Sequence, residues 1–134
     1  MKAALTSLLL ADPDLEALVG TRVHWLTLPP GEAGAPYLIL QEISEVEPMH
    51  LEGPTGLRFA RLQTDAWGER LADAVAVADA IEDLLNGYAA VSGGIRFERI
   101  TKEMRRDIGP VDADGTRILS RVSMDFEVVW SKET

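Results

Sequence analysis

The sequence has no cysteine and only two histidines among its 134 residues. The absence of cysteine excludes disulfides and thiolate metal sites, and it fits a protein that folds in a reducing cytoplasm. No apolar run approaches the roughly 20 residues that a membrane-spanning helix needs, and the start of the chain has no small-residue cleavage site of a secretory leader. We therefore expect a soluble, unprocessed protein without a membrane partner.

Aromatic side chains and positive charge are also scarce. The chain has three Trp, two Tyr and three Phe, and its 22 acidic residues exceed its 13 basic ones to give a net charge of -9. A chain of this charge repels a phosphate backbone unless its basic residues gather on one surface. The few aromatic residues provide no row of stacking rings for a single strand. This composition argues against specific binding of DNA.

Residues that could carry catalysis or hold a metal ion are equally few. His24 and His50 have no partner at a useful spacing, and the sequence has neither a Gly-x-Ser-x-Gly elbow nor a phosphate-binding P-loop. Acidic residues fall mostly on the polar side of the segment 69–86, where we expect solvated charge rather than acid–base chemistry. We expect no enzymatic activity, no cofactor and no metal site.

The length suits one domain, which we expect to span residues 1–134. Its most regular stretch is an alternating strand at Leu57–Trp67, which turns at Gly68 into a long helix over about residues 69–86. An apolar stripe along this helix consists of Leu71, Ala74, Val75, Ala78, Ile81 and Leu85. We expect the stripe to pack on the apolar face of a strand at Ile118–Trp130, which alternates most clearly.

The rest of the chain divides into shorter elements. The pattern predicts helices at Lys2–Leu10 and from Pro13 to Gly20, and further strands at Arg22–Leu26, Pro36–Val46 and Ile95–Met104. Breaker residues predict loops at Leu28–Ala35, Pro48–Gly56 and Arg105–Gly115, the second too long for a tight hairpin turn, and a short connection at 86–94. In Ile95–Met104 the apolar residues change face, which indicates a bulge or coverage on both sides.

These elements predict an α+β fold. We expect a two-layer sandwich in which a mostly antiparallel sheet of four to five strands is covered by one long helix (about 69–86) plus the N-terminal helices.

Two groups of residues are candidates for contact with a partner. Met49, His50 and Leu51 lie in a connection rich in glycine and proline, where apolar side chains either fold back or meet a partner. Arg58, Arg105 and Arg106 belong to a sparse basic set that could form a small positive patch and set the register between subunits. The alternative is that these arginines pair with nearby surface acids, each pair worth roughly 0–1 kcal/mol.

The order of several segments resembles that of the tail completion, or tail terminator, family of tailed bacteriophages. These segments are Leu15–Gly20 with Arg22-Val23, Pro36–Leu40, Gly53-Pro54 followed by Leu62–Trp67, Leu84–Gly87, and Arg121–Phe126. The likeness spans nearly the whole chain, and the order is more specific than any one segment.

The resemblance implies a structural virion protein rather than an enzyme. It implies a ring, usually of six subunits, on the head-proximal end of the tail tube, where the ring ends tube growth and joins the tail to the head connector. Such a protein would be made in the cytoplasm of the bacterial host, and DNA would pass through its ring without specific binding. The same part would serve a phage or a phage-derived particle such as a gene transfer agent. The segments 49–51 and 105–115 would then be candidate contacts between subunits.

Two other interpretations of the residues remain open. One is a cytoplasmic ligand-binding or regulatory α+β domain with a pocket between helix and sheet. The other is a hydrolase whose site has no recognisable motif.

Overall fold

The computed structural model describes residues 1–32, 34–112 and 118–133. Its elements in chain order are α1 (Lys2–Ala11), α2 (Pro13–Val19), β1 (Val23–Trp25), β2 (Tyr37–Val46), β3 (Met49–His50), β4 (Gly53–Pro54), β5 (Arg58–Gly68), α3 (Leu71–Leu85), β6 (Ala90–Ser92), β7 (Ile95–Asp112) and β8 (Ile118–Lys132). The α+β composition is confirmed, and apart from β7 the expected helices and strands are present with bounds that differ by two residues or fewer.

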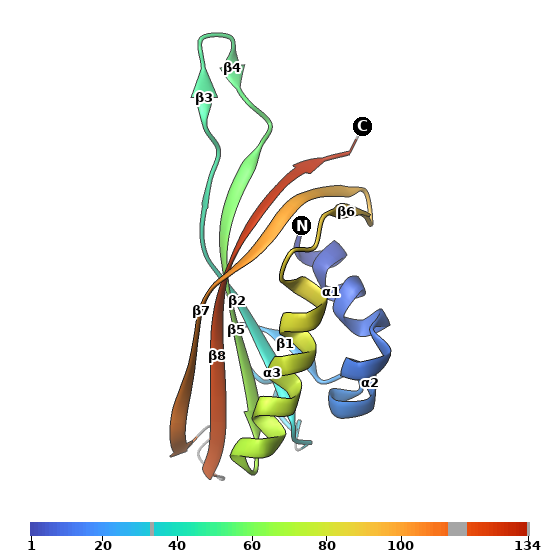
Figure 1. Ribbon diagram of the computed structural model, residues 1–134, viewed down its shortest axis with the longest axis vertical. Helices are drawn as coiled ribbons and strands as arrows, with labels where there is room; N and C mark the ends of the chain where they lie inside the picture. Colours follow the sequence, from blue (N-terminus) through green and yellow to red (C-terminus); the bar gives the residue numbers. More distant parts are fainter. Residues whose placement is uncertain (33, 113–117, 134) are drawn as a thin grey trace.

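The sheet is larger than the sequence predicts. Six strands form one curled, mixed sheet in the order β1-β2-β5-β8-β7-β6, with β1 parallel to β2 and the other pairs antiparallel. The three helices lie together on one side of it (Figure 1). A simple sandwich of four to five strands under one long helix is therefore wrong. The short strand expected at Arg22–Leu26 is β1, whereas no pattern in the sequence predicts β6, whose three residues are too few for a periodic signal.

The core lies between the helices and the sheet face that they cover. From the helices it includes Leu5, Leu9, Leu15, Val19, Ala74, Val77, Ala78, Ile81 and Leu85, and from the sheet Leu38, Leu40, Ala60, Leu62, Ala66, Phe97, Ile100, Val122, Met124, Phe126, Val128 and Trp130. The predicted packing of the long helix on the apolar face of the last strand is therefore confirmed. These side chains fill the space between helix and sheet where a ligand-binding domain would need its pocket.

The long helix α3 starts later than expected, and its buried side differs slightly from the predicted stripe. It begins at Leu71, which is 45% exposed, whereas Val77 is fully buried although the predicted stripe omits it. Gly68 explains the entry into the helix, since a Cβ at this position would lie 2.8 Å from the backbone nitrogen of Ala74. The backbone of β5 can thus turn closely against the first turn of α3, and Leu71 is left at the rim of the core.

The segment 48–56, predicted as a long loop, is instead a hairpin. β3 and β4 pair with Met49 opposite Pro54 and His50 opposite Gly53, so that only Leu51 and Glu52 form the turn. Gly53 has φ +121°, a conformation that side chains disfavour. The expected loop is therefore wrong at its centre, where β3 and β4 form a separate two-stranded sheet, while the pairing of β2 with β5 ends at Val46 and Phe59.

The predicted loop at Arg105–Gly115 is also wrong over most of its length. β7 continues to Asp112 and pairs with β8 throughout, with register shifts between Phe97 and Arg99, between Lys102 and Met104, and between Ile108 and Val111. Residues 113–117 lie outside the described residues. The first shift confirms the expected bulge, since Phe97 and Ile100 are both buried in the core. β7 carries many charges because much of it faces solvent rather than the helices.

The second face of the sheet has no helix over it (Figure 1). On β8 this face carries Leu119, Arg121, Ser123, Asp125, Glu127 and Val129, opposite to the core-facing residues. Among the described residues, no helix combines the length and apolar character required to cross a membrane.

Candidate functional site

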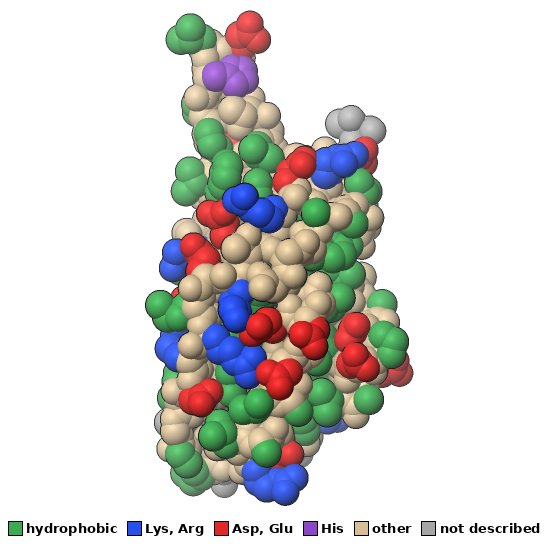
Figure 2. Space-filling model, viewed as in Figure 1, with side chains coloured by type: hydrophobic (Ala, Val, Ile, Leu, Met, Phe, Trp, Pro, Cys, Tyr) green, Lys and Arg blue, Asp and Glu red, His purple; other side chains and the backbone are tan. Residues whose placement is uncertain are grey.

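An arm formed by residues 47–57 is the most prominent candidate surface. It continues β2 and β5 beyond the sheet and projects from one end of the molecule (Figure 1). At its tip Leu51 is 108% exposed and Met49 is 69% exposed. Figure 2 shows hydrophobic, acidic and histidine side chains gathered at this end. The arm therefore offers its apolar residues to solvent instead of folding them back on the body.

The tip has an ordered hydrogen-bond pattern. The backbone N–H of Glu52 donates to Nδ1 of His50 at 3.1 Å. The neutral ring in this arrangement carries its proton on Nε2, which points away from that bond and can donate to a partner. The tip thus combines two apolar side chains with a donor on His50 and an acceptor on Glu52.

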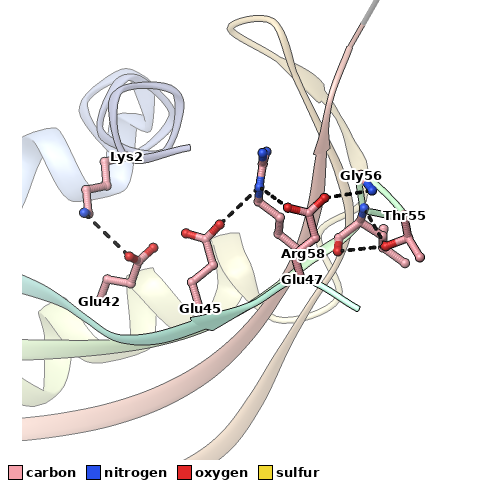
Figure 3. A network of polar contacts seen from close by, with 8 residues as sticks. Lys2, Glu42, Glu45, Glu47, Thr55, Gly56 and Arg58 are labelled. Atoms are coloured by element: carbon pink, nitrogen blue, oxygen red, sulfur yellow. Dashed lines mark hydrogen bonds and ion pairs between the residues drawn. The ribbon is translucent and has the colours of Figure 1, made fainter. Parts of the chain in front are cut away.

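The base of the arm is held by ion pairs (Figure 3). Arg58 Nε lies 3.3 Å from Glu45 and 3.7 Å from Glu47. The N–H of Gly56 donates to Glu47 at 2.9 Å, across the two strands of the arm. Lys2 in turn lies 3.7 Å from Glu42, which ties α1 to the same strand. These contacts fix the direction in which the arm leaves the sheet.

Arg105, another candidate interface residue, reaches across to α3. Its Nη1 lies 2.9 Å from Asp79 and 3.1 Å from Glu82, while Lys102 Nζ lies 3.0 Å from Glu82. The hydrogen bond from Lys102 is the main reason why the pKa of Glu82 is lowered, and burial opposes it. Burial acts to lower the pKa of Arg105, but hydrogen bonds to Asp79 and Glu82 outweigh it and the pKa is raised. Arg105 thus connects sheet to helix.

Arg106 points to the opposite, helix-free face. Its Nη1 lies 3.6 Å from Asp125, and Arg61 on the same face lies 3.2 Å from Glu103. The three candidate arginines therefore do not form one patch, because Arg58 is at the arm, Arg105 is under α3 and Arg106 is on the far face. Figure 2 shows basic and acidic side chains interspersed on the visible side. Their role in an interface remains a prediction.

A hollow of about 510 Å³ on the helix-free face is a feature that the sequence did not suggest. Its apolar wall includes Leu26, Leu28, Tyr37 and Trp67, and Asp65 and Arg121 also line it. The rings of Tyr37 and Trp67 stack with centroids 6.1 Å apart, and the Arg121 guanidinium lies 5.0 Å from the Trp67 centroid. No spacing could have revealed this hollow, because strand pairing and a loop bring its parts together.

The described residues contain no cluster of three or more His, Asp or Glu side chains suited to a metal ion. His24 lies 3.7 Å from Glu32, and His50 is at the arm tip, so the two histidines belong to different parts of the fold.

Comparisons with known proteins give one family and a set of related structures. The family model described as "Tail completion protein gp17" matches residues 3–131. Thirteen chains of solved structures match. One comes from a structure titled "Virion of native gene transfer agent (GTA) particle", with 25% identity, a TM-score of 0.78, and coverage of 98% of this chain and 94% of that chain. No curated protein matches the sequence.

Proposed function

This chain belongs to the Tail completion protein gp17 family, and we propose that it forms a ring on the head-proximal end of the tail tube of a phage or gene transfer agent. In this role the protein is structural and not an enzyme. The ring ends growth of the tube and joins the tail to the head connector. The observation that carries the proposal is the match to a chain of a gene transfer agent virion over nearly the full length of both chains.

The shape of the chain supports assembly through unlike surfaces. The arm projects from one end, whereas the hollow lies on the helix-free face of the sheet and the helices, of which α2 and α3 carry acidic residues, lie on the other side (Figures 1 and 2). Contacts between unlike patches generate a closed ring when the rotation between subunits closes. Six subunits, as the family resemblance implies, would give such a ring. The candidate contact residues are Met49, His50, Leu51, Arg58, Arg105 and Arg106.

The proposed partners are further copies of this chain, the tail tube protein and the head–tail connector protein. DNA passes through the ring without specific binding, since a net charge of -9 repels phosphate. The protein is made in the bacterial cytoplasm and ends in the virion tail.

Deleting the gene in cells that assemble the particle tests this role. We expect electron microscopy to reveal heads without tails together with free tails of irregular length, and expression of the intact chain in trans should restore joined particles. Joined particles with tails of normal length in the deletion strain would contradict the proposal. Labelled protein found along the whole tube, rather than at its head-proximal end, would contradict it as well.

A further inference from the structure

We propose that the hollow on the helix-free face receives the arm tip of a second copy of this chain. This inference rests on the proposed ring and names the surfaces that would close it. The hollow and the tip are complementary in three respects: apolar surface, hydrogen-bonding groups and charge.

The apolar surfaces are on the outside of both parts. Leu26 stands at the rim of the hollow with its side chain 66% exposed and its backbone at φ +70°. A leucine rarely adopts this conformation, which costs of order 1 kcal/mol or more and is often associated with function. The tip provides Leu51 and Met49, which are the two most exposed of the large hydrophobic side chains that the structure describes. Contact would remove these side chains from water together.

Two polar atoms in the hollow lack a hydrogen bond among the described residues. Asp65 is only 7% exposed, and although its Oδ2 accepts a hydrogen bond from Gln63 at 2.9 Å, its Oδ1 has none among the described residues. Arg121 Nε likewise has no hydrogen bond within the described chain; at 3.9 Å from Asp65 Oδ1 it forms an ion pair with that carboxylate but not a hydrogen bond. Buried groups without hydrogen bonds destabilise a protein. Because both atoms are shielded from solvent, a partner gains affinity from them when its docking shifts these side chains enough to supply the hydrogen bonds.

The tip carries groups of the matching kinds. Nε2 of His50 can donate toward the acceptors Gln63 and Asp65, and the Glu52 carboxylate can accept from Arg121. In this arrangement the Glu52 carboxylate faces the Arg121 guanidinium, and the N–H of His50 faces the oxygens of Gln63 and Asp65. A neutral apolar peptide would leave these groups unpaired, which favours the tip over a purely hydrophobic occupant.

The contact has to form between two copies. The N–H of Leu26 donates to the carbonyl of Leu40 at 2.8 Å, which places Leu26 beside the middle of β2. The tip at Leu51 lies eleven residues further along the chain than Leu40, or about 35 Å away where the chain is extended. Each subunit would therefore give its tip to one neighbour and receive the tip of the other, which is the arrangement that propagates around a ring.

Disulfide trapping tests this contact, because the chain has no cysteine of its own. The double variant Leu51→Cys/Leu26→Cys changes two exposed side chains and is expressed in cells that assemble the particle. On mild oxidation we expect a ladder of covalent multimers on a non-reducing gel. The matched control Leu51→Cys/Val91→Cys, with Val91 exposed on β6, should give none. Cysteines whose Cα atoms are more than about 7 Å apart cannot be bridged.

Other results would overturn the contact. The contact would be contradicted if the double variant gave no ladder or if the control gave an equal one. It would also be contradicted by a dimer of the single variant Leu51→Cys, or by a disulfide between the cysteine of Leu26→Cys and a different protein. Adding Glu52→Lys to the double variant should slow trapping several-fold because the introduced ammonium group would face Arg121, whereas Asp83→Lys on α3 should not. An unchanged rate with Glu52→Lys would also contradict the contact. Joined particles with normal tails but no ladder would overturn this inference and leave the proposed function standing.

Discussion

The guanidinium carbon of Arg58 lies 4.7 Å from the centre of the Trp130 ring, at the point where the arm leaves the sheet. The same side chain makes ion pairs with Glu45 near the end of β2 and with Glu47 at the start of the arm. Arg58, the first residue of β5, therefore connects the end of β2 and the first residue of the arm to the end of β8. Although Arg58 is a candidate interface residue, its contacts within the chain give it a second role, which is to set the direction of the arm.

Replacing Arg58 with alanine should loosen the arm while the body remains folded. We expect a loss of about 1 kcal/mol in the free energy of unfolding from the cation–π contact and the ion pairs. Amide hydrogen exchange should accelerate over residues 47–57 and stay unchanged in α3. Arg99→Ala, which removes a pair with Glu127 on an exposed side chain, is the control and should leave the arm unaffected. Equal exchange of the arm in both variants would contradict this role.

The double substitution Met49→Asp/Leu51→Asp should leave a folded subunit that assembles poorly. Both side chains are already exposed, so the melting temperature should hardly change, whereas two charges at the tip would oppose burial in any contact. Light scattering should report a smaller oligomer than for the unaltered chain. Val91→Asp serves as a control for added charge at an exposed apolar site. An unchanged oligomer size would show that the arm tip is not part of the subunit interface.

Two apolar residues of α3 should differ sharply in their effect on stability. Ile81 is fully buried and Leu71 is 45% exposed. Ile81→Ala should lower the free energy of unfolding by about 2–5 kcal/mol, and Leu71→Ala by about 0.5 kcal/mol or less. Urea denaturation followed by circular dichroism measures both. Similar losses would mean that α3 is rotated relative to the sheet.

Gly68→Ala should destabilise the protein, although alanine is usually less costly than glycine inside a helix or strand. The added methyl would meet the backbone of Ala74 at 2.8 Å, so the turn between β5 and α3 would have to open. We expect a cost of about 1–3 kcal/mol, as for other overpacked sites. Gly109→Ala is a suitable control, because nothing lies within 4 Å of a Cβ there. A melting temperature unchanged by Gly68→Ala would show that the turn adapts freely.

The sequence best predicts the elements in which apolar side chains recur regularly over many residues. β8 and β5 have a regular apolar face, and the stripe on α3 identifies Ala74, Ala78, Ile81 and Leu85 correctly. The stripe includes Leu71 wrongly, because helical spacing says nothing about where the core ends. The period of the apolar residues shows which face of a helix is buried, but tertiary packing decides at which residue the buried part of that face begins and ends.

The elements that the sequence misses depend on partners far along the chain. The residues of the second half of β7 are polar and predict a loop. In the folded chain, however, Arg105 forms an ion pair with Glu82 on α3, and Arg106 forms one with Asp125 on β8. The apolar residues 49–51 could be singled out because they stand among glycines and prolines. The hollow could not, since Leu26 and Arg121 have no relationship in the sequence and meet only after strands pair.

The pairing of Glu82 with Lys102 predicts how stability depends on pH. Because the pKa of Glu82 is lowered in the folded chain, first by the hydrogen bond from Lys102, the folded state binds the carboxylate proton less readily than the unfolded state. This stabilisation is complete above the ordinary glutamate pKa of about 4.3 and is lost as the pH falls through the lower, folded value. Glu82→Gln should therefore destabilise the protein by about 1 kcal/mol or less at neutral pH, and by progressively less as the pH falls below about 4. Asp83→Asn, at an exposed neighbour on the same helix, is the control in denaturation measured across this range. A Glu82→Gln deficit that stays constant down to acidic pH would show that the loss arises from packing and not from the charge of the carboxylate.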